Sequence, residues 1–499
     1  MSENNKRPDQ RRTEGVPQRR RPADLRDESG ARRPHNPQRG DERSPVRREA
    51  RGDRPLRQRP AQPQKTDIRR APSNTARAGR SLPEKRKTET SLSYDERENK
   101  GLKGFVRNNL LATSKEKDER WEAQSIQRQR HGVDRPMLII ILVILALGTI
   151  MVFSASFPSA LSEKGDSYYY IRNQLLWVAI GGAVMILLSF FNYKFFKMMA
   201  IPAAVVAIVL LVLVLIMGTA RGVAQRWLSL GFISFQPSEL AKAAMILVLA
   251  FYIDKYYGDP NRKPGKVRGY LRTVINPMII FGVFCGLVLL EKHLSGTIIL
   301  GLIGVAIVFF SGTNILAMSL TYGTVAGLAG FVYLMNNDYA MERILTHQDE
   351  NADVLDEAWQ TTQGLLAIGN GGLFGVGLGE SDLKYNYVSE AHNDFIFTIW
   401  CEEMGFIGAI LLIGLYGLFV WRGITIAKKA PDAFSSLTAF GITFQVGIQS
   451  ALNIMVVTNI IPNTGVSLPF FSYGGTSLII LMAEMGVLLS ISKHSYQKK

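Results

Sequence analysis

Long apolar runs in the second part of the sequence constrain the fold most strongly. An α-helix needs about 20 apolar residues to cross roughly 30 Å of hydrocarbon, and ten segments of about that length occur after Met137. They lie at about 137–155, 174–191, 196–217, 237–253, 274–291, 295–311, 314–335, 394–421, 434–458 and 470–491. The sequence therefore predicts an all-α polytopic membrane protein with about ten transmembrane helices.

The composition changes where these runs begin. Residues 1–136 hold 36 of the 58 Lys and Arg residues and 21 of the 42 Asp and Glu residues, a net charge of +15 against +1 for the remainder. Low hydrophobicity with many Arg, Pro, Gln and Ser residues is typical of disorder. We expect a disordered basic tail over 1–133, a transmembrane domain over 134–492 and a short tail over 493–499. Attraction to anionic lipid and docking of a partner stay open for the basic tail, whereas nucleic acid is not expected, because aromatic residues do not interleave with the arginine runs.

The distribution of Lys and Arg between loops predicts the orientation. With the amino terminus inside, the inner loops and the carboxyl tail hold fourteen of these residues and the outer loops hold seven. The positive-inside rule then places both termini in the cytoplasm. The long loop 336–393, between the seventh and eighth spans, and the helix entrance at Asp394 are therefore expected on the outer face.

One stretch concentrates ionisable groups at this predicted outer boundary. Gln360–Gly405 begins as a polar, glycine-rich loop and continues into the eighth apolar span without a proline. Its glycines lack the ending of a phosphate-binding loop and favour a semi-flexible loop against the membrane surface. An Asp at bilayer depth costs about 2.5–3.5 kcal/mol on insertion scales, so Asp394 is either a helix cap or a functional carboxylate. The other ionisable residues here are Lys384, Glu390, His392, Glu402 and Glu403.

Three further motifs place polar groups near the membrane. Arg226 precedes the motif Gln236–Lys242, in which Glu239 and Lys242 are three residues apart and can pair on one helix face. Such a pair is either structural or lines a polar cavity. The cluster Glu291–Thr297 is consistent with side chains that snorkel to the interface. In Asn453–Ser477, two prolines and a Gly-Gly pair interrupt apolar sequence, which indicates a re-entrant wall of a polar cavity, with hydroxyls from Ser472, Tyr473 and Thr476.

Taken together, these motifs closely resemble the SEDS family of cell-wall proteins over about residues 137–492. The matching motifs are Gln236-Pro237-Ser238-Glu239-Leu240 with Lys242, Ile368-Gly369-Asn370-Gly371-Gly372-Leu373-Phe374-Gly375, His392-Asn393-Asp394-Phe395-Ile396-Phe397 and Pro469-Phe470-Phe471-Ser472-Tyr473-Gly474-Gly475. The resemblance implies a peptidoglycan glycosyltransferase that polymerises lipid II, a class B penicillin-binding transpeptidase as partner, and an essential Asp394. The chain departs from the family pattern in two places. Lys292-His293-Leu294-Ser295 stands where Gln-Pro-Asp-Leu is frequent, so the aspartate is missing at Leu294, and Ser389 stands where proline is common.

The implied reaction assigns roles to these residues. Joining a sugar hydroxyl to a carbon that carries a lipid pyrophosphate requires a base, which we predict is Asp394, with a pKa raised by partial desolvation. Lys384 and Arg226 are candidates to neutralise the pyrophosphate, directly or with a divalent cation, and no other cofactor is expected. Glu390 and His392 are expected to orient the loop or assist. The residues expected to line the cavity are Glu239, Lys242, Ser472 and Tyr473.

Alternative functions remain open at this stage. Ten spans with intramembrane charges also suit a lipid II flippase, and a non-catalytic scaffold for a transpeptidase is a third possibility. An enzyme is favoured because the ionisable residues cluster on one face and no inverted repeat is evident. The segment Ile461-Pro462-Asn463-Thr464-Gly465 favours a division-type protein at the septum of a bacterial cytoplasmic membrane, among divisome proteins, over elongation and sporulation types.

Overall fold

The computed structural model describes residues 132–221, 224–229, 234–257, 266–337, 341, 347 and 359–495. Almost all of the predicted basic tail, 1–133, lies outside these residues. The described helices are α4 (Arg135–Lys164), α5 (Tyr169–Phe190), α6 (Tyr193–Met217), α7 (Pro237–Tyr257), α8 (Lys266–Tyr270), η1 (Leu271–Ile275), α9 (Asn276–Leu290), α10 (Leu294–Phe310), α11 (Ile315–Met335), α13 (Trp359–Asn370), α14 (Ile396–Lys428), α15 (Ala433–Val457) and α16 (Thr476–Lys493).

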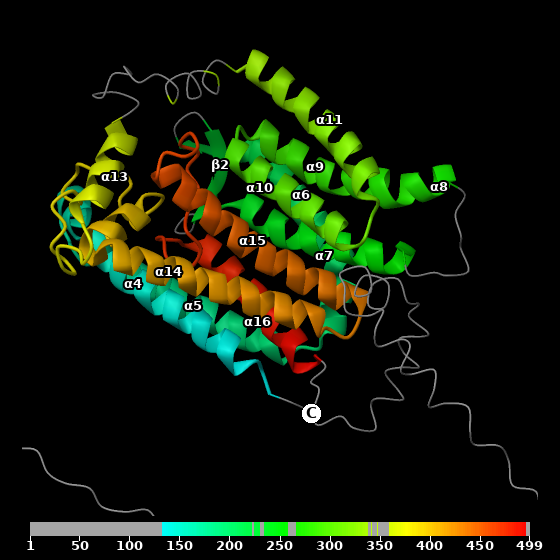
Figure 1. Ribbon diagram of the computed structural model, residues 1–499, viewed down its shortest axis with the longest axis horizontal. Helices are drawn as coiled ribbons and strands as arrows, with labels where there is room; N and C mark the ends of the chain where they lie inside the picture. The colour runs from blue at the N-terminus through cyan, green and yellow to red at the C-terminus, as the bar shows by residue number, and fades with distance from the viewer. Residues whose placement is uncertain are drawn as a thin grey trace, which may run out of the picture. The chain divides into compact units, whose positions relative to one another are not determined.

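The predicted polytopic helical fold is confirmed. Within the described residues, eight helical segments are long and apolar enough to cross a membrane: α4, α5, α6, Val267–Leu290, α11, α14, α15 and α16. The two other predicted spans are also helices, but α10 has only 17 residues and α7 carries charged residues at both ends. Figure 1 shows α4, α5, α14 and α15 as long neighbouring helices inclined in one direction.

Helix α7 lies at the centre of the bundle. It packs against α6, α9, α10 and α15, and small side chains such as Ala241 and Ala244, which are fully buried, allow this close approach. Pro237 at its first position and Glu239 in its first turn suit a helix start. This start places Glu239 and Lys242 at one end of the bundle core.

A small sheet precedes α7 and was not predicted. Strands β1 (Thr219–Arg221), β2 (Ala224–Ser229) and β3 (Ser234–Phe235) form an antiparallel three-stranded sheet in the order β1-β2-β3. The Thr476 hydroxyl, at the start of α16, donates to the Ser234 carbonyl at 3.1 Å. The sheet therefore fixes Arg226, on β2, beside the starts of α7 and α16.

The loop before the eighth span and the span itself differ from the prediction. Trp359–Asn370 is not loop but the helix α13, which packs against α14. Helix α14 is not continuous, because Gly405 has φ 68° and ψ −170° and breaks it. Glycine adopts this left-handed backbone without steric cost, so the helix breaks without a proline.

The wall predicted between the last two spans agrees with the structure. Residues 458–475 are non-helical and line part of a cavity, and α16 begins at Thr476 rather than at residue 470. The Asn453 amide of α15 donates to the Val466 carbonyl at 2.6 Å, so a buried side chain supplies one of the bonds that this irregular backbone needs.

Candidate active site

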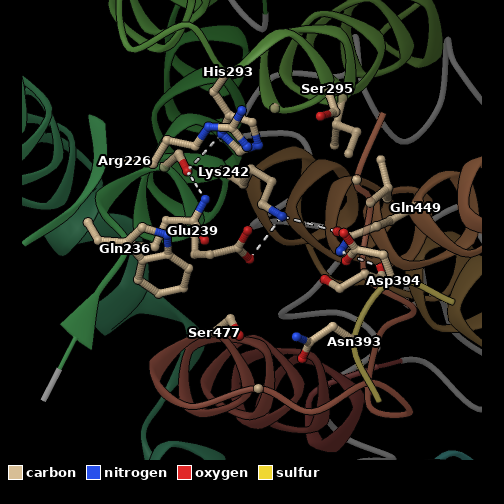
Figure 2. Close-up of a pocket in the computed structure, with 18 of the residues that line it drawn as sticks. Arg226, Gln236, Glu239, Lys242, His293, Ser295, Asn393, Asp394, Gln449 and Ser477 are labelled. Carbon is tan, nitrogen blue, oxygen red and sulfur yellow. Dashed lines mark hydrogen bonds and ion pairs between the residues drawn. The ribbon is translucent and has the colours of Figure 1, made fainter. Parts of the chain in front are cut away.

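A polar cavity of about 290 Å³ lies where β2, the start of α7, and the segments that precede α10, α14 and α16 meet. Its walls come from segments more than 200 residues apart in the sequence. The sequence-predicted residues that line it are Asp394, Arg226, Glu239, Lys242, Glu390 and Tyr473. Figure 2 shows the side chains of Glu239, Lys242, Gln449 and Asp394 turned toward a common space.

Asp394 lies just before α14 and does not cap it. The N-cap of α14 is Phe395, whose side chain makes no capping hydrogen bond. Burial raises the pKa of Asp394 to about 6; Glu390 raises it further and Arg226 opposes the shift. Gly465, with φ 66°, lies so close that a Cβ there would be 3.2 Å from Asp394 Oδ2. The carboxylate therefore closely approaches a wall position that favours glycine.

The backbone around Asp394 is held in place through three consecutive carbonyl groups, each of which accepts one hydrogen bond from another segment. The Tyr473 amide donates to the His392 carbonyl at 2.9 Å, and the Ser472 hydroxyl to the Asn393 carbonyl at 2.7 Å. The Asn453 amide donates to the Asp394 carbonyl at 2.7 Å. Asn453 is fully buried and also binds the cavity wall at Val466. One side chain of α15 thus links the segment that carries Asp394 to the wall opposite.

Lys242 is the centre of a second set of contacts. Its Nζ lies 2.9 Å from Glu239 Oε2 and donates to Gln449 Oε1 at 3.0 Å. Gln449 in turn donates to the Ser467 carbonyl at 3.1 Å. Figure 2 shows these bonds between Lys242, Glu239 and Gln449. Lys242 is almost fully buried, so its charge is fixed in position and faces the cavity.

Arg226 approaches the cavity from β2. Its Nη2 donates to the Lys292 carbonyl at 3.3 Å, which ties the sheet to the turn before α10. His293, in that turn, also lines the cavity, with Nδ1 3.5 Å from Ser238 Oγ. Burial lowers the pKa of His293 to about 3, and the charges of Arg226 and Lys242 act in the same direction. At neutral pH this ring is therefore uncharged.

The snorkelling interpretation of the cluster Glu291–Thr297 fails for Glu291 and His293, whereas the Lys292 side chain is exposed and agrees with it. Glu291 is 1% exposed and His293 is 7% exposed, so neither side chain reaches a lipid–water interface. Burial raises the pKa of Glu291 to about 8, against the charge of Arg226. Leu294 begins α10 and is not among the residues that line the cavity. In the absence of an aspartate there, Glu239 is the carboxylate that pairs with Lys242.

The structure does not bring Lys384 to the cavity. Lys384 is 2% exposed, and its Nζ lies 3.1 Å from Glu403 Oε1 and 3.3 Å from Ser154 Oγ. A buried carboxylate on α14 needs such a partner, because an unpaired one is strongly destabilising. The expected contact of Lys384 with pyrophosphate is therefore corrected to an ion pair that fastens the loop to α14.

Two other predicted site residues have supporting positions. His392 is buried, its ring centroid lies 4.4 Å from that of Tyr170, and burial lowers its pKa. Ser472 is also buried, and its hydroxyl binds the Asn393 carbonyl. Neither residue lines the cavity, whereas Tyr473 and Glu390 do. His392 and Ser472 therefore shape the wall rather than contact its contents.

Sequence reasoning missed Gln449 and gave no role to Asn453, which it named only as the first residue of the wall motif Asn453–Ser477. Both lie on α15, four residues apart, on a helix that also carries Gln445 and Ser450. Residues at this spacing share a helix face, and polar residues inside a span generally face the bundle interior. That signal was present in the sequence and would have found them.

The cavity contains a general base and positive charges, the groups needed to remove a proton and to stabilise a developing negative charge. Asp394 is a carboxylate whose pKa is close to neutrality, which suits a general base. Arg226 and Lys242 supply fixed positive charge in a partly desolvated space, where it stabilises an anion more strongly than in water. Among the described residues, no three His, Cys, Asp or Glu side chains converge on a metal site. A divalent cation would need the oxygens of a bound pyrophosphate as further ligands.

The chain has clear relatives of known type. Residues 135–497 match the FtsW/RodA/SpoVE family, described as a cell cycle protein. The chain is 36% identical over 369 residues to a probable peptidoglycan glycosyltransferase FtsW of Geobacter sp. (strain M18), which covers 73% of this chain and 98% of the relative. It is 38% identical over 366 residues to the stage V sporulation protein E of Bacillus subtilis (strain 168), which covers 72% of this chain and 97% of the relative.

Solved structures agree with these relatives. The rod shape determining protein RodA of Thermus thermophilus has a TM-score of 0.54 and 28% identity, over 73% of this chain and 98% of RodA. A chain solved in work on the coordination of polymerization and crosslinking by a peptidoglycan synthase complex has a TM-score of 0.61 and 28% identity, over 73% and 99% of the two chains. The predicted resemblance is confirmed, and the protein belongs to the FtsW/RodA/SpoVE family of multi-pass membrane proteins.

Proposed function

We propose that the protein is a peptidoglycan glycosyltransferase that polymerises lipid II into glycan strands at the outer face of the cytoplasmic membrane. The observation that carries the proposal is the placement of Asp394, with a pKa near 6, in a cavity that also contains Arg226 and Lys242. Relatives named as peptidoglycan glycosyltransferases support the reaction class. The Lys and Arg distribution supports cytoplasmic termini and an outward-facing cavity.

The reaction uses few protein groups. Asp394 takes the proton from the acceptor sugar hydroxyl as the hydroxyl oxygen forms a bond to the anomeric carbon of the donor. The bond from that carbon to the pyrophosphate oxygen breaks, and the lipid pyrophosphate leaves with the electron pair. Arg226 and Lys242 stabilise the negative charge on the leaving group, while Glu239 holds Lys242 in place. Glu390 and Tyr473 form the wall on the Asp394 side.

The direct test is polymerisation of lipid II by the purified Asp394→Asn protein. The amide has nearly the same shape and leaves the three backbone bonds around residue 394 unchanged, so the fold should persist while the base is lost. Base catalysis is typically worth about 10²–10⁴-fold in rate, and we expect a loss of that size. Glu380→Gln, on an exposed side chain of the same loop, is the matched control. Glycan chains made by Asp394→Asn at the wild-type rate would refute the assignment.

The biological setting is also a proposal. We assign the protein to septal synthesis during cell division, with a class B penicillin-binding transpeptidase as partner. Similarity to a chain from a peptidoglycan synthase complex supports a partner that crosslinks. Depletion of the protein should produce filamentous cells, and a fluorescent fusion should collect at midcell. Loss of rod shape without filamentation would assign the protein to elongation instead.

A further inference from the structure

The segment before α14, the helix that breaks at Gly405, exposes many large apolar side chains. We propose that residues 365–378, here termed the re-entrant element, are embedded in the hydrocarbon of the leaflet at the Asp394 end of the bundle. The element comprises the second half of α13 and the glycine-rich turn that follows it. The occupant that we assign to its outer face is lipid acyl chains, and not water or a second protein.

The exposed face of the re-entrant element is entirely uncharged. No charged residue occurs between positions 365 and 378, and the next one is Glu380. Phe374 is 79% exposed, which is extreme for a large apolar side chain. Contiguous apolar patches of this kind are rare on surfaces that face water. The exposed apolar side chains of the element are Leu365, Leu366, Leu373, Phe374, Val376 and Leu378.

The element continues the exposed apolar surface of α14. After the break, that surface runs from Phe406 to Trp421, and Arg422 follows it. Sixteen helical residues span about 24 Å, which is shorter than the roughly 30 Å of a hydrocarbon core. The Phe406 and Ile407 amides donate to the Gly372 and Leu373 carbonyls at 2.9 and 3.2 Å. The re-entrant element therefore extends the exposed apolar surface of α14 at the end where that surface is too short to cover the hydrocarbon core.

The part of α14 before the break is shielded from lipid. All residues from Ile396 to Glu403 are buried, and α13 packs against this part of the helix. At this height the surface available to lipid therefore includes α13 and the turn after it. The polar groups of this layer point inward. Glu402 accepts bonds from Asn370, at 2.8 Å, and from Ser381, while Glu403 pairs with Lys384.

The backbone of the element satisfies the requirement for membrane burial. Irregular backbone at membrane depth is tolerated where protein groups supply its hydrogen bonds. The Val376 and Gly377 amides donate to the Glu402 and Glu403 carbonyls, which the break at Gly405 releases, at 3.0 and 3.1 Å. Glycine permits this approach, because a Cβ at Gly375 would lie 2.1 Å from the Glu403 carbonyl oxygen. The turn and the break are therefore one hydrogen-bonded unit.

Embedding the element would set the height of the active site. The loop continues from it through Lys384, which is fixed to α14, to Asp394 at the start of that helix. If the proposed function holds, this arrangement keeps Asp394 just above the hydrocarbon, at the depth of the lipid phosphates. The embedding itself does not depend on the reaction, so it is tested by a physical measurement.

The first test measures collisions of a spin label in lipid nanodiscs. The full-length protein, with Cys285 and Cys401 replaced by alanine, carries the label at Phe374→Cys or, as the matched control, at Glu380→Cys. We expect oxygen, which concentrates in hydrocarbon, to relax the label at 374 more than a water-soluble nickel chelate does. The order should reverse at 380. Equal access of the chelate to both positions would overturn the proposal.

The second test needs no cysteine replacement. A benzophenone amino acid at position 374 of the otherwise unchanged protein is irradiated in nanodiscs of phosphatidylglycerol and phosphatidylethanolamine. We expect a mass increase equal to one phospholipid, with none when the same group is at position 380. Absence of lipid adducts at 374 would contradict the embedding. If the benzophenone group at 374 instead formed adducts with an added transpeptidase and none with lipid, the element would be a protein docking surface, and the embedding proposal would equally be overturned.

Discussion

At the scale of single residues, Asp394 depends on groups that never touch its carboxylate. Three donors, from Tyr473, Ser472 and Asn453, bind the carbonyl oxygens of residues 392–394. The segment is therefore positioned through its backbone, and the side chain can change its protonation state without loss of these bonds. The backbone bonds therefore position Asp394, and its carboxylate carries out the proton transfer. Substitutions can alter either one without the other.

The pH dependence of polymerisation follows from the pKa of Asp394. A general base acts only when it is deprotonated, so kcat/KM should rise with pH and reach half of its maximum near pH 6. At pH 5 about one tenth of the carboxyl would be deprotonated, and the rate should fall about tenfold. A rate that stays constant from pH 8 to pH 5 would contradict the role of Asp394 as base.

Two neighbours should move this pH profile in opposite directions. Glu390 raises the pKa of Asp394 and Arg226 lowers it. Glu390→Gln should therefore shift the half-maximum to lower pH, and Arg226→Gln should shift it to higher pH and also slow polymerisation at its plateau. Profiles of both variants, measured beside Glu380→Gln as a control, check the signs. A shift of both variants in the same direction would be inconsistent with this electrostatic arrangement.

Asn453 should act as a positioning residue. Asn453→Leu removes the donors to the Asp394 and Val466 carbonyls. Misplacement of a reacting group by about 1 Å can cost about 10²-fold in rate, so kcat should fall strongly while KM changes little. Ser472→Ala removes one of the three bonds and should cost less. Thr438→Val, on a buried side chain of α15 outside the cavity lining, is the control for helix packing. Equal losses in Asn453→Leu and Thr438→Val would indicate a general packing defect.

At the scale of elements, local sequence predicted the helices and the irregular wall before α16, but not the break inside α14. The spans could be predicted because hydropathy over about 20 residues is a local property. The break at Gly405 depends on a turn about thirty residues earlier, which supplies partners to the released carbonyls of α14. The role of Lys384 was wrong for the same reason, since its partner Glu403 becomes a neighbour only when the turn packs on α14. Asp394, by contrast, could be predicted as a cavity residue, because a carboxylate at a membrane boundary is costly whatever the conformation of the loop before it.

Two glycines of α14 test the break. A Cβ on Gly405 would lie 2.3 Å from the Gly375 amide nitrogen, and its φ of 68° already disfavours a side chain. Gly405→Ala should therefore lower the melting temperature and polymerisation activity. Gly414→Ala, on the same helix with nothing within 4 Å, should be neutral or stabilise by up to about 1 kcal/mol. The measurement is thermal unfolding of both variants in detergent. An unchanged melting temperature in Gly405→Ala would mean that the break at Gly405 does not contribute to stability.

At the scale of the whole molecule, a bonded junction marks the beginning of the helical domain. The relatives align with nearly their full length to about 72–73% of this chain, and the match to the family begins at residue 135. Asp134 caps α4 and accepts three hydrogen bonds from Arg422 on α14: its Oδ1 from Nε at 2.9 Å, and its Oδ2 from Nε at 3.1 Å and from Nη2 at 2.6 Å. Its amide donates to Ser492 of α16 at 3.1 Å. Three helices thus fix the point where residues 1–133 join the domain.

Removal of the basic segment should therefore leave catalysis intact and change attraction to membranes. The variant with residues 134–499 keeps Asp134 and every residue of the cavity, so its polymerisation rate in neutral detergent should equal that of the full chain. It loses the whole +15 charge of residues 1–136, because Asp134 and Arg135, which it keeps, cancel. Each basic residue near an anionic surface contributes about 1 kcal/mol of attraction. Any dependence of activity on phosphatidylglycerol content should then weaken, and Arg422→Ala, which breaks the junction but keeps the basic segment, controls for damage to the domain. Loss of polymerisation in detergent by a 134–499 variant with a normal melting temperature would show that the segment takes part in the reaction itself.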